Sequence, residues 1–227
     1  MDVTHSNDDV WLIVPLFNEA SVVRDVVADA RATFPNIVCV DDGSTDHSIA
    51  EALAGGATVL RHPINLGQGA ALQTGMEFSR EQPGAQYFVT FDSDGQHQVS
   101  DAEAMVERLR TEPYDIIVGS RFLDRRTNAS ALKRFVLRVA VLFERISTGV
   151  RLTDAHNGLR AFNLHAAFSL NIKQNRMAHA SEIVAQIGSH HLRYAEQPVH
   201  IVYTEYSRSK GQSLWNSVNI LSELFVK

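Results

Sequence analysis

The first 120 residues alternate between short apolar runs typical of strands and longer segments in which apolar residues recur at helical spacing. Strands are expected at residues 10–14, 36–40, 57–60, 87–91 and 116–118. Helices are expected at residues 19–33, from Ser44 or Thr45 as the cap to about residue 53, at 70–80, and from a capped start at 100–103. Strands separated by helices form a parallel sheet through right-handed crossovers. The alternation therefore predicts an α/β fold with a mostly parallel sheet flanked by helices.

Polar side chains follow each expected strand of this sheet. They are Asn18 and Glu19, Asp41 and Asp42, Asn65, Asp92 and Asp94, and Ser120 and Arg121. Ligands of such sheets bind at the carboxyl ends of the strands. The sequence therefore predicts a binding site at this edge.

The fourth expected strand ends in two carboxylates, Asp92 and Asp94, one residue apart. Side chains alternate along a strand, so both carboxylates are expected to point to the same side. Paired carboxylates are hard oxygen ligands suited to Mg²⁺ or Mn²⁺, which keep open positions for substrate phosphates. An acidic turn after a strand is the alternative interpretation of the pair.

Composition restricts the class of protein. A chain of 227 residues is one large domain or a domain with an appendage, and its net charge of −5 argues against nucleic acid as a partner. The single cysteine, Cys39, lies in an apolar run, so we expect a buried thiol in a reducing compartment. The polar N-terminus does not resemble a secretory signal, and no stretch has 18 uninterrupted apolar residues.

After residue 120 the alternation weakens. Residues 132–146 are apolar on nearly all sides but carry basic residues, which predicts an amphipathic helix at a membrane surface. A helix is expected at 177–188, strand within 194–203, and an amphipathic helix in the appendage 214–227. The catalytic domain is expected to span residues 1–213.

Five motifs have a specific joint order: residues 14–19, 40–46, 65–67, 91–97 and 119–122. With residues 154–162 and 206–213 they resemble family 2 glycosyltransferases, most closely the polyprenyl-phosphate glycosyltransferases of the dolichyl-phosphate mannose synthase type. The resemblance covers roughly residues 10–213 and implies a GT-A fold, a UDP- or GDP-sugar donor and a divalent metal, Mg²⁺ or Mn²⁺.

The donor site follows from this resemblance. Asp42 is expected to accept hydrogen bonds from the base or ribose, with Pro15, Asn18 and Glu19 shaping the same pocket. Gly67 is expected in a tight turn against the nucleotide. A dinucleotide fingerprint is rejected, because it requires its glycines after the first strand, whereas Gly67 and Gly69 follow the third. The metal and diphosphate residues are Asp92, Asp94 and Gln96. Asp94 is the main expected metal ligand and one of the expected catalytic residues, and His97 is expected to support the site from behind or to be structural. The alternative interpretation of these residues is structural: ordinary turns after the strands, and a proline that ends the first strand.

The expected acceptor is a polyprenyl phosphate of undecaprenyl or dolichyl type, attacking the anomeric carbon with inversion. An anionic acceptor needs cations and no general base. Arg121, Arg134 and Arg138 are the predicted cations, and Arg208 and Lys210 belong to a loop expected to close over phosphates. Asp154 would be the base for a hydroxyl acceptor, and Glu182 is placed near the reaction centre by the resemblance.

Alternatives from other classes are transfer to a saccharide hydroxyl, a hydrolase with an aspartyl nucleophile, and a non-catalytic nucleotide-binding scaffold. Many relatives continue into transmembrane helices, whereas this chain stops at Lys227. We therefore expect peripheral attachment at the cytoplasmic face of the membrane, or docking onto a small membrane protein. A homo-oligomer is left open.

Overall fold

A computed structural model describes residues 6–123 and 149–202. In chain order its elements are β1 (Val10–Leu16), α1 (Val23–Arg31), β2 (Asn36–Asp41), α2 (Ser48–Gly55), β3 (Thr58–Arg61), α3 (Gln68–Arg80), β4 (Tyr87–Thr90), α4 (Val99–Thr111), β5 (Ile116–Ser120), β6 (Arg160–Asn163), α6 (Leu164–Ser169), α7 (His179–Ser189) and β7 (Tyr194–Pro198). Within these ranges no helix is long and apolar enough to cross a bilayer.

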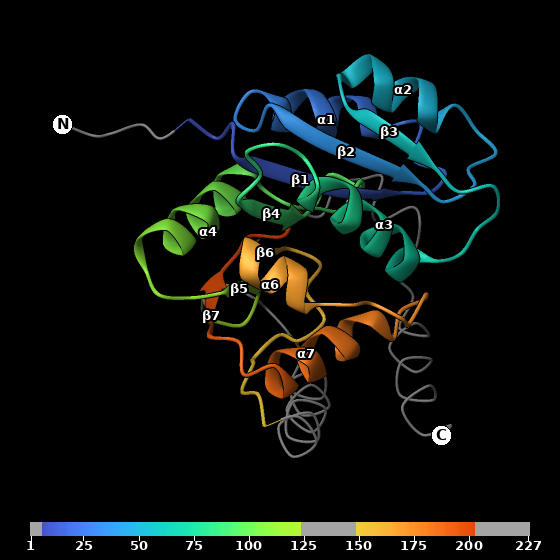
Figure 1. Cartoon of the computed structure of the whole chain (residues 1–227). Coiled ribbons are helices and arrows are strands. Elements are labelled where there is room, and N and C mark those ends of the chain that lie inside the picture. The colour runs from blue at the N-terminus through green and yellow to red at the C-terminus, as the bar shows by residue number, and fades with distance from the viewer. Residues whose placement is uncertain (1–5, 124–148, 203–227) are drawn as a thin grey trace.

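The seven strands form one twisted sheet in the order β3-β2-β1-β4-β6-β5-β7 (Figure 1). Four of the six neighbouring-strand pairs are parallel. The other two involve β6, which runs antiparallel to both β4 and β5. The prediction of a mostly parallel sheet is confirmed. Neither β6 nor α6 was expected, because a four-residue strand that is buried has no alternating pattern by which to recognise it.

Helices cover both faces of the sheet. Residues of α1, α2 and α4 pack with Leu12, Val14 and Cys39 in one apolar cluster. Residues of α3, α6 and α7 pack with Ile13, Val38 and Val40 in a second cluster. Neighbouring residues of one strand therefore enter opposite clusters, which explains why the central strands are apolar without interruption.

The first strand continues through Pro15, so the expectation of a proline stop at residue 14 is wrong. Leu16 accepts a bond from the amide of Asp42, and Ile13 accepts one from the amide of Phe91, so odd positions of β1 face β4. The nitrogen of Pro15 therefore points past the end of β4 at Thr90, where no ladder bond is lost.

Helix starts differ from the predicted caps. α2 begins after His47 and α4 after Gln98, and neither of these residues makes a side-chain cap bond. The hydroxyl of Ser44 instead accepts a hydrogen bond from the amide of Asn18. Serine is a favoured capping residue, but the hydroxyl of Ser44 binds a neighbouring loop and does not cap α2.

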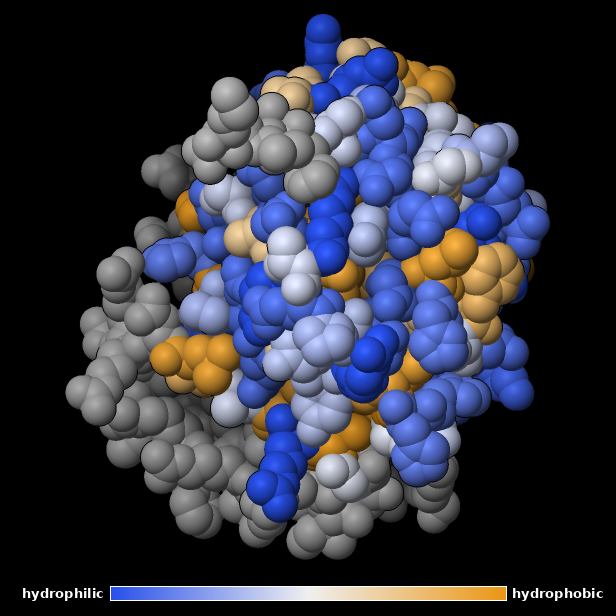
Figure 2. All heavy atoms as spheres, turned by 60° about the vertical axis from the view of Figure 1, so that its left-hand side comes forward, coloured by the Kyte–Doolittle hydropathy of each residue, from blue (hydrophilic) through white to orange (hydrophobic). Residues whose placement is uncertain are grey.

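Cys39 is fully buried, and burial raises the pKa of its thiol to about 12, which confirms an inert core cysteine. On the face seen in Figure 2, hydrophobic residues of the described chain occur in small patches separated by hydrophilic ones. Among the described residues, that face shows no wide apolar surface.

Candidate active site

Polar loops meet where β1, β2 and β4 end, at the point where the strand order reverses direction from β1. Asn18 has a φ of 54°, a conformation that asparagine tolerates, and its side-chain oxygen accepts from the amide of Thr45. The hydroxyl of Ser48 accepts from the amide of Glu19. These bonds tie the β1–α1 turn to the β2–α2 loop and thereby build the expected edge site.

Asp42 is buried and accepts three hydrogen bonds. Its Oδ1 accepts from the amide of Leu66 at 2.9 Å and pairs with His62 Nδ1 at 2.8 Å, while its Oδ2 accepts from the amide of Gly67 at 2.7 Å. The other nitrogen of His62 contacts Thr74 Oγ1 at 3.0 Å. Asp42 therefore holds the β3–α3 turn, and its contact with a nucleotide stays a prediction.

Asp92 lies beyond the end of β4, so strand alternation does not orient it, and that part of the sequence argument is wrong. Its Oδ1 accepts from Gln68 Nε2 at 3.2 Å and its Oδ2 pairs with His97 Nε2 at 2.9 Å. Burial alone raises the pKa of this carboxyl, but the charge and hydrogen bond of His97, with the charge of Arg160, outweigh it and hold the pKa below its usual value. Asp92 is thus fixed in its charged form.

Asp94 has the opposite environment. Burial and the neighbouring charges of Asp92 and Glu19 raise its pKa, although its Oδ1 accepts from the amide of Gln96 at 3.0 Å. Two repelling carboxylates of hard oxygen character fit Mg²⁺ or Mn²⁺. Within residues 6–123 and 149–202 no three His, Cys, Asp or Glu side chains converge on a metal position, so such an ion would also need oxygen ligands from substrate and water.

The glycine turn before α3 packs against a second chain segment. A Cβ on Gly67 would lie 2.3 Å from the carbonyl oxygen of Asn175, and one on Gly69 would lie 2.0 Å from that of Gln174. The amide of Gly69 donates to the Asn175 carbonyl at 2.8 Å. The glycines therefore allow close backbone approach, which agrees with the rejection of a dinucleotide fingerprint.

Asp154 and Arg121 form a two-pronged ion pair. Arg121 Nε lies 2.6 Å from Asp154 Oδ2 and its Nη2 lies 2.8 Å from Oδ1, and the Arg121 amide also donates to Oδ2. The carboxylate is 3% exposed. Both carboxylate oxygens already accept hydrogen bonds from the Arg121 guanidinium, so this geometry argues against Asp154 as a general base.

Glu182, on α7, accepts the amides of Lys173 and Gln174 at 2.9 and 2.8 Å through its Oε2. The carboxylate therefore holds the segment that covers Gly67 and Gly69. Its role in the structure is to position that segment.

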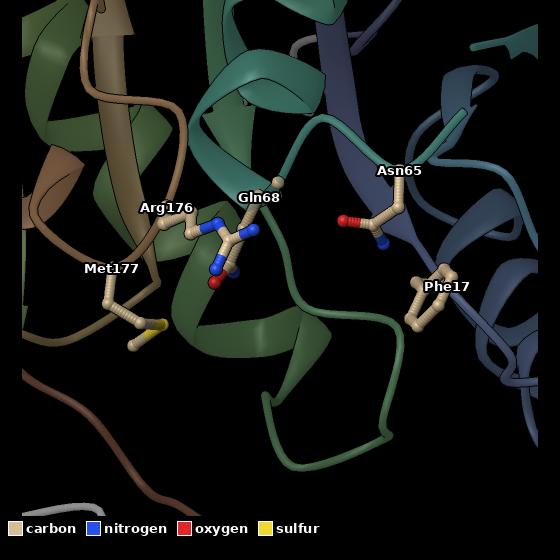
Figure 3. A pocket seen from close by; sticks show the side chains of 6 residues that line it. Phe17, Asn65, Gln68, Arg176 and Met177 are labelled. Atoms are coloured by element: carbon tan, nitrogen blue, oxygen red, sulfur yellow. The ribbon is translucent and has the colours of Figure 1, made fainter. Parts of the chain in front are cut away.

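A pocket of about 410 Å³ opens beside this segment, lined by Phe17, Asn65, Gly67, Gln68, Arg176 and Met177. Figure 3 shows Phe17 and Asn65 on one side of it and Gln68, Arg176 and Met177 on the other. Phe17 is 44% exposed, so an aromatic ring faces the solvent at this edge of the sheet.

Residues 11–166 match the family model described as "Glycosyl transferase family 2". The chain belongs to glycosyl transferase family 2. It is 33% identical to an uncharacterised protein of Methanocaldococcus jannaschii over 98% of this chain and 93% of that one. It is 28% identical to a UDP-N-acetylglucosamine–dolichyl-phosphate N-acetylglucosaminyltransferase of Methanococcus voltae, over 96% of this chain and 95% of the relative.

Among solved structures, this glycosyltransferase resembles glucosyl-3-phosphoglycerate synthase of Mycobacterium tuberculosis, crystallised with Mg²⁺ and UDP. The TM-score is 0.67 at 19% identity, over 89% of this chain and 74% of that one. A likeness at this identity shows a shared fold, and the GT-A prediction is confirmed.

Several predicted residues of the glycosyltransferase lie outside the described ranges: Arg134, Arg138, Arg208 and Lys210, together with the segments 132–146 and 214–227. The structure does bring together Pro15, Asn18, Glu19, Asp42, Gly67, Asp92, Asp94 and Gln96 around the ends of β1, β2 and β4.

Sequence reasoning assigned no role to Arg160 and His62. Arg160 is 1% exposed, donates to the carbonyl of Ala155 at 2.8 Å and helps to lower the pKa of Asp92. A charged residue at the start of a short apolar run was the available signal. His62 gave no such signal, because its partner Asp42 lies 20 residues away.

Proposed function

We propose that this chain is an inverting, metal-dependent glycosyltransferase that moves a sugar from a nucleoside-diphosphate sugar to a polyprenyl phosphate. Proteins of this kind are among its relatives, including the dolichyl-phosphate enzyme of Methanococcus voltae. Another is an undecaprenyl-phosphate 4-deoxy-4-formamido-L-arabinose transferase of Shewanella sediminis, 26% identical over 96% of this chain and 65% of the relative.

The observation that supports a phosphate acceptor is the engagement of Asp154, the residue predicted as the base for a hydroxyl acceptor. Asp154 is paired with Arg121, and Glu182 is bonded to two backbone amides. A hydroxyl acceptor needs a base to remove its proton, whereas a phosphate acceptor is already an anion. Both oxygens of Asp154 are already engaged by Arg121, and this favours the phosphate as acceptor.

The donor is proposed to lie along the edge from Phe17 to the Asp92–Asp94 turn. An exposed aromatic ring stacks on any base. Asp42 is a pure acceptor whose Oδ2 has accepted one bond, so it suits a base with an N–H edge, as in UDP- or GDP-sugars.

Asp94, with support from Asp92 and Gln96, would hold the divalent cation. When bound there, Mg²⁺ or Mn²⁺ supplies charge neutralisation for the departing nucleoside diphosphate. Around it, Gln68 and His97 keep the Asp92 carboxylate in one orientation. Such fixed side chains lower the cost of reorganisation during transfer.

A polyprenyl phosphate resides in a membrane, so we propose that the enzyme works at the membrane surface, on its cytoplasmic face. Arg134, Arg138, Arg208 and Lys210 are the proposed acceptor-facing cations. Attachment through residues 214–227, or through a small membrane protein, belongs to the same proposal, as does any assembly into a homo-oligomer.

The test is a transfer assay with purified protein, Mn²⁺, a panel of UDP- and GDP-sugars, and undecaprenyl phosphate. Nucleoside diphosphate release that depends on the lipid, with the sugar recovered on the lipid phosphate, is the expected result. Release with an oligosaccharide acceptor and none with the lipid would sink the proposal. Binding to vesicles that contain anionic lipid, compared with neutral vesicles, tests the membrane part separately.

A further inference from the structure

The segment 171–178 between α6 and α7 is held at several points. Glu182 accepts the amides of Lys173 and Gln174, and Gln73 Oε1 accepts the amide of Ile172 at 2.7 Å. Gln186 bonds both the amide and the carbonyl of Asn171. A surface segment with this many side-chain bonds has a defined course, so the side chains it carries are presented in fixed places.

The same segment closes the first turn of α3. The Asn175 carbonyl accepts from the amides of Gly69 at 2.8 Å and Ala70 at 3.4 Å, and Asp42 accepts from the amide of Gly67. Free amides at a helix start commonly bind phosphate. Here these amides already have protein partners, so a phosphate entering the pocket must be neutralised by another group.

Arg176 is in position to do so. Its carbonyl accepts two bonds from His179, one from the amide at 3.1 Å and one from Nδ1 at 2.7 Å, which fix its backbone. Its side chain is exposed and lines the pocket, with the guanidinium directed toward Gln68 (Figure 3). In the described part of the chain this guanidinium makes no hydrogen bond or ion pair, so its five donors are available.

One side of the pocket is suited to stacking a nucleobase, and the other side carries a positive charge. Phe17 and Asn65 line one side, and Gln68, which bonds the Asp92 carboxylate, lines the other beside Arg176. A nucleotide stacked on Phe17 would therefore direct its phosphates across the pocket, toward Arg176 and toward Gln68, the partner of Asp92. A guanidinium fork binds phosphate oxygens in pairs.

We propose that Arg176 is a donor-binding residue whose guanidinium contacts the diphosphate of the nucleotide sugar beside Gln68. This inference rests on the proposed function. The segment 171–178 thereby supplies a positive charge for the diphosphate, whereas the amides at the start of α3 are already bonded to protein groups.

Isothermal titration of the full chain with UDP, GDP and the matching nucleosides, in Mn²⁺ and without lipid, tests this assignment. Arg176→Gln should weaken binding of the nucleoside diphosphate roughly 10- to 100-fold and leave the nucleoside nearly unchanged, as expected for lost charge-assisted bonds. Arg176→Lys should recover part of the loss. Lys173→Gln removes the same charge from an exposed site on the same segment and should have little effect.

Three results would overturn the assignment. Equal weakening of nucleoside and nucleoside diphosphate would mean that Arg176 acts on the fold of the pocket. Equal effects of Arg176→Gln and Lys173→Gln would mean general electrostatics. Unchanged diphosphate binding with a raised KM for undecaprenyl phosphate would assign Arg176 to the acceptor. If the wild-type protein binds no nucleoside diphosphate at all, the proposed function fails together with this inference.

Discussion

Gly69→Ala tests the contact between the start of α3 and the segment 171–178. The added methyl carbon would lie 2.0 Å from the carbonyl oxygen of Gln174 and 2.9 Å from the Cβ of His179. Both neighbours are backbone or backbone-attached atoms, so neither can turn aside as a flexible side chain would. The segment has to move away from the helix.

The size of the movement sets the cost. Ordinary contact needs a separation of about 3.4 Å, so the Gln174 carbonyl must retreat by about 1.4 Å. That displacement breaks the bond from Gly69 to Asn175 and the two bonds to Glu182, which measure 2.8, 2.9 and 2.8 Å. At ~1 kcal/mol each they sum to about 3 kcal/mol, and alanine in a helix returns at most ~1 kcal/mol.

The expected loss in free energy of unfolding is therefore about 2–3 kcal/mol, which lowers Tm by roughly 4–12 °C. Arg176 moves with the segment, so donor binding should also weaken by about tenfold. Differential scanning fluorimetry and titration with UDP measure the two effects on the same preparation.

Gly84→Ala is the matched control. Its methyl group would meet nothing within 4 Å, but its φ of +79° costs an alanine about 1 kcal/mol. This variant should lose stability and keep donor affinity. A Gly69→Ala protein with wild-type Tm and wild-type donor affinity would refute the close packing on which the reasoning depends.

Two further predictions concern carboxylates. Asp94→Asn should abolish transfer and slightly raise Tm in the absence of metal, because it removes a charge that Asp92 repels. Mn²⁺ should raise the Tm of the wild type and leave that of the variant unchanged. An equal rise in both proteins would contradict the assignment of Asp94 as a metal ligand. The Arg193 side chain lowers the pKa of Asp115 to about 2 through a hydrogen-bonded pair, and a lowered carboxyl pKa stabilises the fold above the unfolded pKa. That stability, about 1–2 kcal/mol after solvent screening of the exposed Arg193, should be lost as pH falls from about 4 to 2. Urea unfolding should therefore show a smaller acid loss in Asp115→Asn, and an identical loss in both proteins would contradict the pairing.

The sequence by itself determined the five strands of the first 120 residues, the edge at which the site lies, and the family. These features are local: strand periodicity, the residue after each strand and the order of the motifs are all visible along the chain. The same reasoning placed Asp42, Asp92 and Asp94 together, because the ends of parallel strands meet at one edge of a sheet.

Tertiary structure alone decided what these residues do to one another. Arg121 and Asp154, expected to serve a phosphate and a proton, neutralise each other across 33 residues of sequence. Glu182 accepts hydrogen bonds from two backbone amides, and the amide of Gly69 donates to the carbonyl of Asn175, more than 100 residues further along the chain. Charges and hydrogen-bond donors act over a few ångströms, so their partners depend on which loops the fold brings together, and spacing along the chain carries no record of that.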